Sequence, residues 1–342
     1  MSDKAVVVTG GCGFIGSHLV RMLLSEHPDT SVLNLDLLTY AGNPANLADL
    51  AGDARLSFSR CDISDEQAVS RALSDWGKTP RYVINLAAES HVDRSVLAPE
   101  SFLRTNVAGT YTLLELCRCT PGVRFLQVST DEVYGSLGPE GCFTEESPLR
   151  PNSPYSASKA SADLLVRAWH RTFGLDAVIT RCSNNYGPYQ FPEKLIPLMI
   201  LHAASGQELP VYGDGKNVRE WLHVSDHCHG ILAALFHGSS GAIYNFGGEA
   251  ERTNIDVVHY IADRIGGRRD LVRFVPDRPA HDWRYALTSE RARRDLGWNP
   301  RVHFETGLSQ TIDWYLANES WWRPILTGDY MRFRDLWYGG RR

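Results

Sequence analysis

A glycine-rich turn near the N-terminus constrains the fold of this chain more than any other feature. Gly10, Gly13 and Gly16 follow a short apolar run that ends at Val8. The segment after them, residues 15–24, carries apolar residues at helical spacing. Glycines so placed between a strand and a helix allow a tight turn, close approach of a diphosphate to the backbone, and close packing of the helix on a sheet. The turn therefore predicts the first strand and helix of a dinucleotide-binding fold.

Short apolar runs alternate with helical patterns through the first half of the chain. The runs are at residues 6–8, 32–35, 82–86, 125–128 and 177–180. Runs of this length, joined by helical segments, are typical of buried parallel strands with crossover helices. We therefore predict an α/β fold with a Rossmann-type doubly wound parallel sheet.

After about Cys182 the loops become richer in Pro, Gly, Asn and Tyr, which indicates a second, smaller, mixed α/β substrate-binding domain. We expect a dinucleotide-binding domain over residues 1–185, with return segments around 219–248. The interleaved substrate-binding domain then takes residues 186–218 and 249–335. No flexible linker separates the two parts in the sequence, so we expect them to pack around a shared cleft.

The composition excludes several classes of protein. The chain has 342 residues, of which 43% are hydrophobic and 22% charged, and its net charge is -5. Nucleic-acid and membrane-surface proteins need a basic excess. The seven cysteines form no disulfide framework in a chain this long. With neither a signal peptide nor a long apolar run, we expect a soluble cytoplasmic protein with no nucleic-acid or membrane partner.

An acidic residue at the end of the second apolar run favours one dinucleotide over another. Asp36 follows Gly16 by twenty residues, where a carboxylate can accept hydrogen bonds from an adenosine ribose. The same carboxylate would repel a 2′-phosphate, so the cofactor is predicted to be NAD rather than NADP. Asp62 and Ile63, after the expected third strand, are candidate adenine contacts, although an Asp at a strand end is just as often a helix cap.

Tyr155 and Lys159 form a candidate catalytic pair. They are four residues apart, so on a helix their side chains share one face. An ammonium beside a phenol favours the phenolate, and moving a tyrosine pKa from about 10 to neutrality requires roughly 4 kcal/mol. Tyr155 could then take a proton from a sugar hydroxyl as hydride leaves the same carbon. An exposed helix pair is the alternative for this spacing alone, but the glycine turn and Ser129-Thr130 favour catalysis.

The chain resembles the extended short-chain dehydrogenase/reductase family and, within it, the dTDP-glucose 4,6-dehydratases. The resemblance covers nearly the whole chain. It rests on the following motifs: Thr9-Gly-Gly-Cys-Gly-Phe-Ile-Gly16, Leu38-Thr-Tyr-Ala-Gly-Asn43, Leu86-Ala-Ala-Glu-Ser-His-Val-Asp-Arg-Ser95, Ser129-Thr-Asp-Glu-Val-Tyr-Gly135, Pro154-Tyr-Ser-Ala-Ser-Lys159, Arg181-Cys-Ser-Asn-Asn-Tyr-Gly-Pro-Tyr-Gln-Phe-Pro-Glu-Lys194, Asn217-Val-Arg-Glu-Trp-Leu-His223 and Asp277-Arg-Pro-Ala-His-Asp-Trp-Arg-Tyr285.

The resemblance implies a lyase that converts dTDP-glucose to dTDP-4-keto-6-deoxyglucose. Oxidation at C4 acidifies the C5 hydrogen, water leaves across C5 and C6, and hydride returns to C6. By the family pattern Tyr155 is the C4-hydroxyl base and Thr130 a hydrogen-bond partner of the C4 oxygen. Asp131 is the acid and Glu132 the base of the elimination, and Lys159 completes the catalytic set. This acidic pair favours a dehydratase over a 4-epimerase or decarboxylase on the same scaffold.

The resemblance also implies the two sets of binding residues. Those expected at NAD are Gly10, Gly13, Phe14, Ile15, Gly16, Asp36, Thr39, Asp62, Ile63, Ala87, Ala88, Thr105, Tyr155 and Lys159. Those expected at the nucleotide-sugar are Ser90, Thr130, Asn184, Lys194, Pro210, Tyr212, Arg219, Asn254, Arg278, His281 and Tyr285. Within the second set, Lys194, Arg219 and Arg278 are the candidates for the diphosphate.

Three further interpretations concern assembly, metals and function. Helical segments at 103–119 and 155–173 carry apolar residues expected to be exposed, Leu113, Leu116 and Leu164. In the family the equivalent pair forms a four-helix bundle with its mate, which predicts a homodimer. We expect no metal at the His and Cys residues of 223–229, which diverge on a helix. Other nucleotide-sugar 4,6-dehydratases, an epimerase and a non-catalytic nucleotide sensor stay open as alternatives.

Overall fold

A parallel sheet forms the centre of the molecule in the computed structural model, which describes residues 4–277 and 281–327. Seven strands of the described chain pair in the order β10-β6-β5-β4-β1-β2-β3, and every pairing is parallel. The strands are β1 (Lys4–Thr9), β2 (Thr30–Asp36), β3 (Leu56–Arg60), β4 (Tyr82–Asn85), β5 (Arg124–Thr130), β6 (Asp176–Cys182) and β10 (Ile243–Phe246). This confirms the predicted Rossmann-type sheet, whose strand order reverses at β1.

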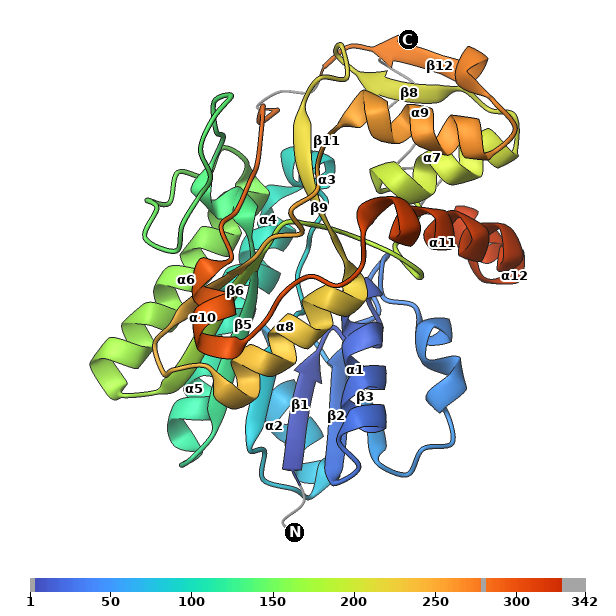
Figure 1. Cartoon of the computed structure of the whole chain (residues 1–342). Helices are drawn as coiled ribbons and strands as arrows, with labels where there is room; N and C mark the ends of the chain where they lie inside the picture. The colour runs from blue at the N-terminus through green and yellow to red at the C-terminus, as the bar shows by residue number, and fades with distance from the viewer. Residues whose placement is uncertain (1–3, 278–280, 328–342) are drawn as a thin grey trace.

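Helices cover both faces of this sheet (Figure 1). Successive residues of β1 point to opposite faces. Val6 and Val8 accordingly pack with one apolar core, to which α1 and α8 contribute, whereas Val7 packs with another, to which α2, α5 and α6 contribute. The bounds are α1 (Phe14–Glu26), α2 (Glu66–Trp76), α5 (Gly109–Cys119), α6 (Pro154–Phe173) and α8 (Val224–His237).

A second lobe lies at the carboxyl ends of the central strands (Figure 1). Its small sheets have the orders β11-β9-β7 and β12-β8, and it has an apolar core of its own. Its elements are β7 (Asn184–Tyr186), α7 (Leu195–Ala204), β8 (Leu209–Tyr212), β9 (Val218–His223), β11 (Glu251–Thr253), α9 (Asn254–Arg264), β12 (Val272–Val275), α11 (Phe304–Ala317) and α12 (Glu319–Trp322). These elements are called the second lobe below.

The remaining helical elements of the described chain are short. They are η1 (Pro44–Leu50), α3 (Val92–Leu97), α4 (Pro99–Phe102), the π-helix η2 (Leu103–Ala108), η3 (Asp131–Tyr134), η4 (Arg269–Leu271), α10 (Glu290–Leu296) and η5 (Arg323–Leu326). None of the described helices has the length and apolar character needed to span a membrane.

One sequence-based expectation about the surface was wrong. Leu113 is completely buried, because it points from α5 into the core beneath the sheet. Leu116 packs against the same core. Leu164 on α6 does have the expected exposure, at 52%.

Candidate functional site

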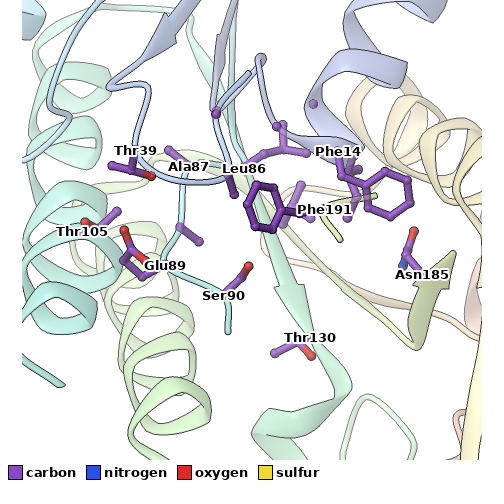
Figure 2. A pocket seen from close by; sticks show the side chains of 18 of the residues that line it. Phe14, Thr39, Leu86, Ala87, Glu89, Ser90, Thr105, Thr130, Asn185 and Phe191 are labelled. Atoms are coloured by element: carbon purple, nitrogen blue, oxygen red, sulfur yellow. The ribbon is translucent and has the colours of Figure 1, made fainter. Parts of the chain in front are cut away.

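A cavity of about 300 Å³ opens where the central strands end. Its walls come from the glycine turn, from the ends of β2, β4, β5 and β6, from α6, and from the segment after β6. Figure 2 shows Thr39, Glu89 and Thr105 on one side and Phe14 and Asn185 on the other, with Phe191 between them. Ligands in open α/β sheets bind at the carboxyl ends of the strands near the point where the strand order reverses, which is the position of this cavity.

The glycine turn is packed too closely for any side chain. A Cβ on Gly16 would lie 2.1 Å from the Gly10 carbonyl oxygen. Gly10 has a φ of +71°, and a Cβ there would lie 2.9 Å from the Ala87 backbone. Helix α1 begins directly after Gly13, which has no side chain to cap it. Gly13, Phe14 and Gly16 line the cavity, so uncapped backbone N–H groups at a helix N-terminus fit the diphosphate of a dinucleotide.

Asp36 lies at the end of β2 in the same cavity. Its carboxylate accepts hydrogen bonds from the backbone N–H of Cys12, at 2.9 Å, and of Leu38, at 2.8 Å. Burial raises the pKa of Asp36, while these two bonds lower it. All the residues expected at NAD line this cavity: Gly10, Gly13, Phe14, Ile15, Gly16, Asp36, Thr39, Asp62, Ile63, Ala87, Ala88, Thr105, Tyr155 and Lys159. Asp62 also accepts from the Ser64 backbone N–H at 2.9 Å.

The acidic pair lies where β5 ends and η3 begins. Asp131 is 2% exposed, and its Oδ1 accepts a hydrogen bond from the Thr130 hydroxyl at 3.1 Å. Its Oδ2 is buried without a hydrogen-bond partner in the described chain. Burial raises the pKa of Asp131 well above its usual range, and the negative charges of Glu132 and Glu220 raise it further. These effects favour the neutral form of the Asp131 carboxyl group, and Glu132 lines the cavity beside it.

Tyr155 and Lys159 are both buried, and both line the cavity from the first turns of α6. Burial raises the pKa of Tyr155 above its ordinary value, and the charge of Glu132 raises it further. The Lys159 ammonium donates to the Val128 carbonyl at 2.7 Å, and burial lowers its own pKa. A positive charge bound in the cavity beside the phenol would oppose the rise in the Tyr155 pKa.

The residues expected at the nucleotide-sugar divide into two groups. Ser90, Thr130, Asn184 and Lys194 line the cavity. Pro210, Tyr212, Arg219, Asn254, His281 and Tyr285 do not line it and lie in or beside the second lobe. Arg278 is outside the described residues. The cavity therefore brings together the residues expected at the cofactor and in catalysis, and four of those expected at the nucleotide-sugar also line it.

Arg219 is the buried cation of the second lobe. It is 5% exposed, and its guanidinium lies 4.5 Å from the Tyr285 ring centroid. It donates to the carbonyl oxygen of Asp282 at 2.9 Å. The charge of Arg219 lowers the pKa of Asp131, and the charge of Glu132 raises the pKa of Tyr285. The Arg219 and Tyr285 side chains thus lie within electrostatic range of the acidic pair.

Tyr212 and His281 form a separate contact in the second lobe. Their rings meet edge to face at 6.1 Å, and His281 also pairs with Asp277 at 2.6 Å. The Tyr212 hydroxyl donates to Asp93 at 3.2 Å. Lys194 donates to the Ser90 carbonyl at 2.9 Å. These bonds join the second lobe to the segment that follows β4.

Sequence reasoning missed a charged cluster at the edge of the cavity. The Arg94 guanidinium lies 3.8 Å from the Tyr40 ring centroid and donates to Glu193 at 3.0 Å. Glu193 is 8% exposed and lines the cavity together with Tyr40 and Glu89. Burial raises the pKa values of both Glu89 and Glu193. The three motifs that hold these residues were recognised, but no spacing rule shows that they meet.

The histidines and cysteine at 223–229 have separate partners. His227 contacts the Asn185 side chain at 2.9 Å, Cys228 the Ile15 carbonyl at 3.7 Å, and His229 the Ser225 carbonyl at 2.8 Å. Across residues 4–277 and 281–327, no group of three or more His, Cys, Asp or Glu side chains is arranged to hold a metal ion.

Known proteins match this chain over nearly its whole length. Residues 7–311 match the family model described as GDP-mannose 4,6 dehydratase. A dTDP-glucose 4,6-dehydratase of Streptomyces niveus is 49% identical over 328 residues, covering 95% of this chain and 96% of the relative. The crystal structure of the dTDP-glucose 4,6-dehydratase of Streptomyces venezuelae with NAD bound is 50% identical, with a TM-score of 0.90, and the match covers 94% of this chain and 99% of that one. The UDP-glucose 4-epimerase of Thermotoga maritima shares the fold at 29% identity and a TM-score of 0.84, over 92% and 99%.

Proposed function

The chain belongs to the dTDP-glucose 4,6-dehydratase family, and from that membership we propose that it converts dTDP-glucose to dTDP-4-keto-6-deoxyglucose with NAD as cofactor. One observation carries the proposal beyond membership. Asp131 is a buried carboxyl group with a raised pKa, and its Oδ2 has no hydrogen-bond partner in the described chain. It lies beside Glu132 in the cavity that the glycine turn and Tyr155 also line. An epimerase has no use for a proton donor of this kind.

The proposed order of the reaction follows the roles that the family resemblance implies for these groups. NAD, when bound, supplies the acceptor for hydride from C4, a positive ring charge, and the hydride that returns to C6. Tyr155 takes the C4 hydroxyl proton, because the cavity then holds the positive charge that the buried phenolate needs. Thr130 hydrogen-bonds the C4 oxygen. With C4 oxidised, Glu132 removes the acidified C5 proton.

Asp131 completes the elimination by donating its proton to the departing C6 hydroxyl, which leaves as water. Its raised pKa keeps that proton in place at neutral pH. Glu132 and Asp131 need opposite protonation states, and they have different surroundings: Asp131 is 2% exposed, whereas Glu132 is only partly buried. When two neighbouring carboxyl groups have different surroundings, the one whose pKa is raised is usually the acid and the other the base.

The second lobe is the proposed binding region for the nucleotide and its diphosphate. Lys194 and Arg219 supply the positive charge, and Arg278 is proposed to join them. Pro210, Tyr212, Asn254, His281 and Tyr285 are proposed to surround the nucleotide, and Ser90, Thr130 and Asn184 the sugar. We propose the interleaved domain division stated for the sequence, with residues 1–185 as its first part.

Homodimer formation and a cytoplasmic location belong to the same proposal. Helices α5 and α6 expose Tyr111 at 49%, Leu164 at 52% and Phe173 at 53%. Exposed apolar side chains on two neighbouring helices suit a two-fold helical bundle. A monomeric mass at micromolar concentration would contradict the dimer.

The test is incubation of the purified protein with dTDP-glucose, UDP-glucose and GDP-mannose in parallel. The 4-keto product is followed by its alkali-induced absorbance, and NADH is followed at the same time. We expect product with dTDP-glucose and no net NADH, because hydride returns to the sugar from which it came. Preference for GDP-mannose, or stoichiometric release of NADH, would overturn the proposal.

A further inference from the structure

Helix α12 is linked to the glycine turn by hydrogen bonds through the Asn46 side chain. The Trp321 indole N–H, on α12, donates to the Asn46 Oδ1 at 2.8 Å. The Asn46 side-chain amide then donates to the Cys12 carbonyl at 2.9 Å. Asn46 is 1% exposed, its bond to Cys12 is buried, and its bond to Trp321 is partly buried. Helix α12 and the glycine turn are more than 300 residues apart in sequence and are linked here by these two hydrogen bonds.

We propose that Trp321 is a positioning residue for the cofactor turn and that it acts by fixing the orientation of the Asn46 side-chain amide. The inference rests on the NAD site of the proposed function. An indole N–H can only donate, so the Asn46 Oδ1 must face Trp321 and the amide NH₂ must face Cys12. With the opposite orientation, the Asn46 Oδ1 would face the Cys12 carbonyl oxygen, and two acceptors would oppose each other.

Both the backbone N–H and the carbonyl of Cys12 are hydrogen-bonded. Its N–H donates to Asp36 at 2.9 Å, and its carbonyl accepts from the Asn43 N–H at 3.0 Å as well as from Asn46. Asp36 is the residue expected at the adenosine ribose. The Asn46 amide therefore helps to fix both the turn that approaches the diphosphate and the carboxylate expected at the ribose.

A ring cluster holds Trp321 in place. The Tyr189 ring centroid lies 5.5 Å from that of Trp321 and 4.7 Å from that of Trp314. The Arg21 guanidinium lies over the Tyr189 ring, 4.7 Å from its centroid. Tyr189 has a φ of +65°, an uncommon backbone conformation for a side chain of this size. Its neighbour Gln190 lines the cofactor cavity. The same cluster therefore orders a second wall of the cavity.

The adjacent residue, Trp322, provides a matched control. Its indole N–H also donates a hydrogen bond at 2.8 Å, but to the Tyr315 carbonyl of α11, away from the glycine turn. Trp321→Phe and Trp322→Phe thus remove the same chemical group from the same helix. Only the first should affect NAD. Asn46→Asp is the third variant, because it keeps an acceptor for Trp321 but places a carboxylate oxygen against the Cys12 carbonyl.

The experiment measures how fast bound NAD leaves the purified holoenzyme. Each protein is diluted into excess alcohol dehydrogenase and ethanol, so that released NAD is reduced and detected by absorbance, and its melting temperature is recorded alongside. Loss of one buried hydrogen bond corresponds to about a tenfold faster release for Trp321→Phe. We expect the wild-type rate for Trp322→Phe and the fastest release for Asn46→Asp.

The outcomes separate this inference from the proposed function. If the wild-type protein binds no NAD, the proposed function fails and this inference with it. If wild type binds NAD but Trp321→Phe releases it no faster than Trp322→Phe, only the positioning role of Trp321 is overturned. Should Trp321→Phe fail to fold, Asn46→Asp decides the question, because it leaves the tryptophan cluster intact; wild-type release from that variant would overturn the role.

Discussion

The two sides of the active-site region are constructed differently. On the cofactor side, the predicted NAD residues all line one cavity at the ends of adjacent parallel strands. On the second-lobe side, Arg219, Tyr285, Tyr212 and His281 bond to one another or to neighbouring side chains and backbone, outside that cavity. In the proposed function, the residues around the sheet carry the chemistry and bind the cofactor, while the second lobe recognises the nucleotide. Changes in the first should alter rate constants, and changes in the second should alter substrate affinity.

The largest effect is expected on the sheet side, at Tyr155. Tyr155→Phe removes the C4-hydroxyl base, so neither the ketone nor the elimination that depends on it can form, and kcat should fall about 10⁴-fold. Tyr134→Phe is the control, since Tyr134 is equally buried but bonds Asn245 and lies outside the cavity. Steady-state rates of product formation measure both. Equal losses in the two variants would mean that Tyr155 serves the fold and not the chemistry.

Substitutions of the two acidic residues should impair two different steps of the elimination. Glu132→Gln should still oxidise C4 but lose solvent exchange at C5, because an amide cannot accept that proton. The kcat of Asp131→Asn should fall about 10²–10³-fold with the natural C6-hydroxyl substrate. A C6-fluoro substrate should recover much of the lost rate. Deuterium incorporation at C5 and fluoride release measure the two steps. If Asp131→Asn slowed both substrates equally, Asp131 would not be the general acid.

The alkaline side of the pH profile adds a test of the same assignment. Asp131 must be protonated to act, and its pKa is raised, so kcat should fall only as the pH rises through that raised pKa. The Asp131→Asn variant has no such group and should lack this decline. A decline that persists in the variant would assign it to another residue.

On the second-lobe side we expect a smaller effect, confined to affinity. Arg219→Lys keeps the charge but loses the planar fork that meets a phosphate bidentately and stacks on Tyr285. KM for dTDP-glucose should rise about tenfold with kcat nearly unchanged. Arg284→Lys is the control, because Arg284 pairs with Glu251 in the same lobe, at 2.5 Å. A fall in kcat equal to the rise in KM would remove the distinction between the two sides.

This difference also explains what the sequence could and could not predict. Gly10 and Gly16 are required by backbone contacts within one strand, turn and helix, and Tyr155 and Lys159 share a face of one helix, so local rules find them. The meeting of Arg94 with Tyr40 and Glu193 depends on three segments far apart in the chain, and no local pattern encodes it. Leu113 was misplaced for a related reason: helical spacing defines an apolar face but not what covers it.

The raised tyrosine pKa shows a second limit of local reasoning. Spacing placed Tyr155 and Lys159 together correctly, but the magnitude of the pKa shift depends on burial and on the charges of other elements. Here burial raises the pKa of Tyr155, the charge of Glu132 raises it further, and the Lys159 ammonium is directed to the Val128 carbonyl. Electrostatic consequences of a motif therefore need the surrounding fold, even when the motif itself is read correctly.

Glu220 lies between the two sides and should give the smallest effect. It is 2% exposed, and it accepts from the Glu249 and Leu287 N–H groups, both at 2.8 Å. Burial raises its pKa to about 7, with Glu251 raising it further and the Leu287 bond and Arg284 lowering it. The folded protein thus binds this proton more tightly than the unfolded chain does. The stability that this proton contributes is complete below about pH 4.5, the ordinary pKa of a glutamic acid, and is lost as the pH rises through about 7.

Glu220→Gln removes this titratable group, so one variant tests both the pH dependence of stability and the effect of Glu220 on the catalytic acid. The free energy of unfolding of wild type minus that of the variant should shrink from pH 5 to pH 8, as urea titrations would show. Because the charge of Glu220 also raises the pKa of Asp131, the alkaline decline of kcat should move to lower pH in the variant. Glu305→Gln is the control and should move neither curve appreciably, because the Glu305 carboxylate lies on the same lobe but is 55% exposed and pairs with Arg252 at 2.5 Å. If the stability difference stayed constant with pH, Glu220 would be ionised throughout, and the second lobe would have no electrostatic effect on the catalytic acid through this residue.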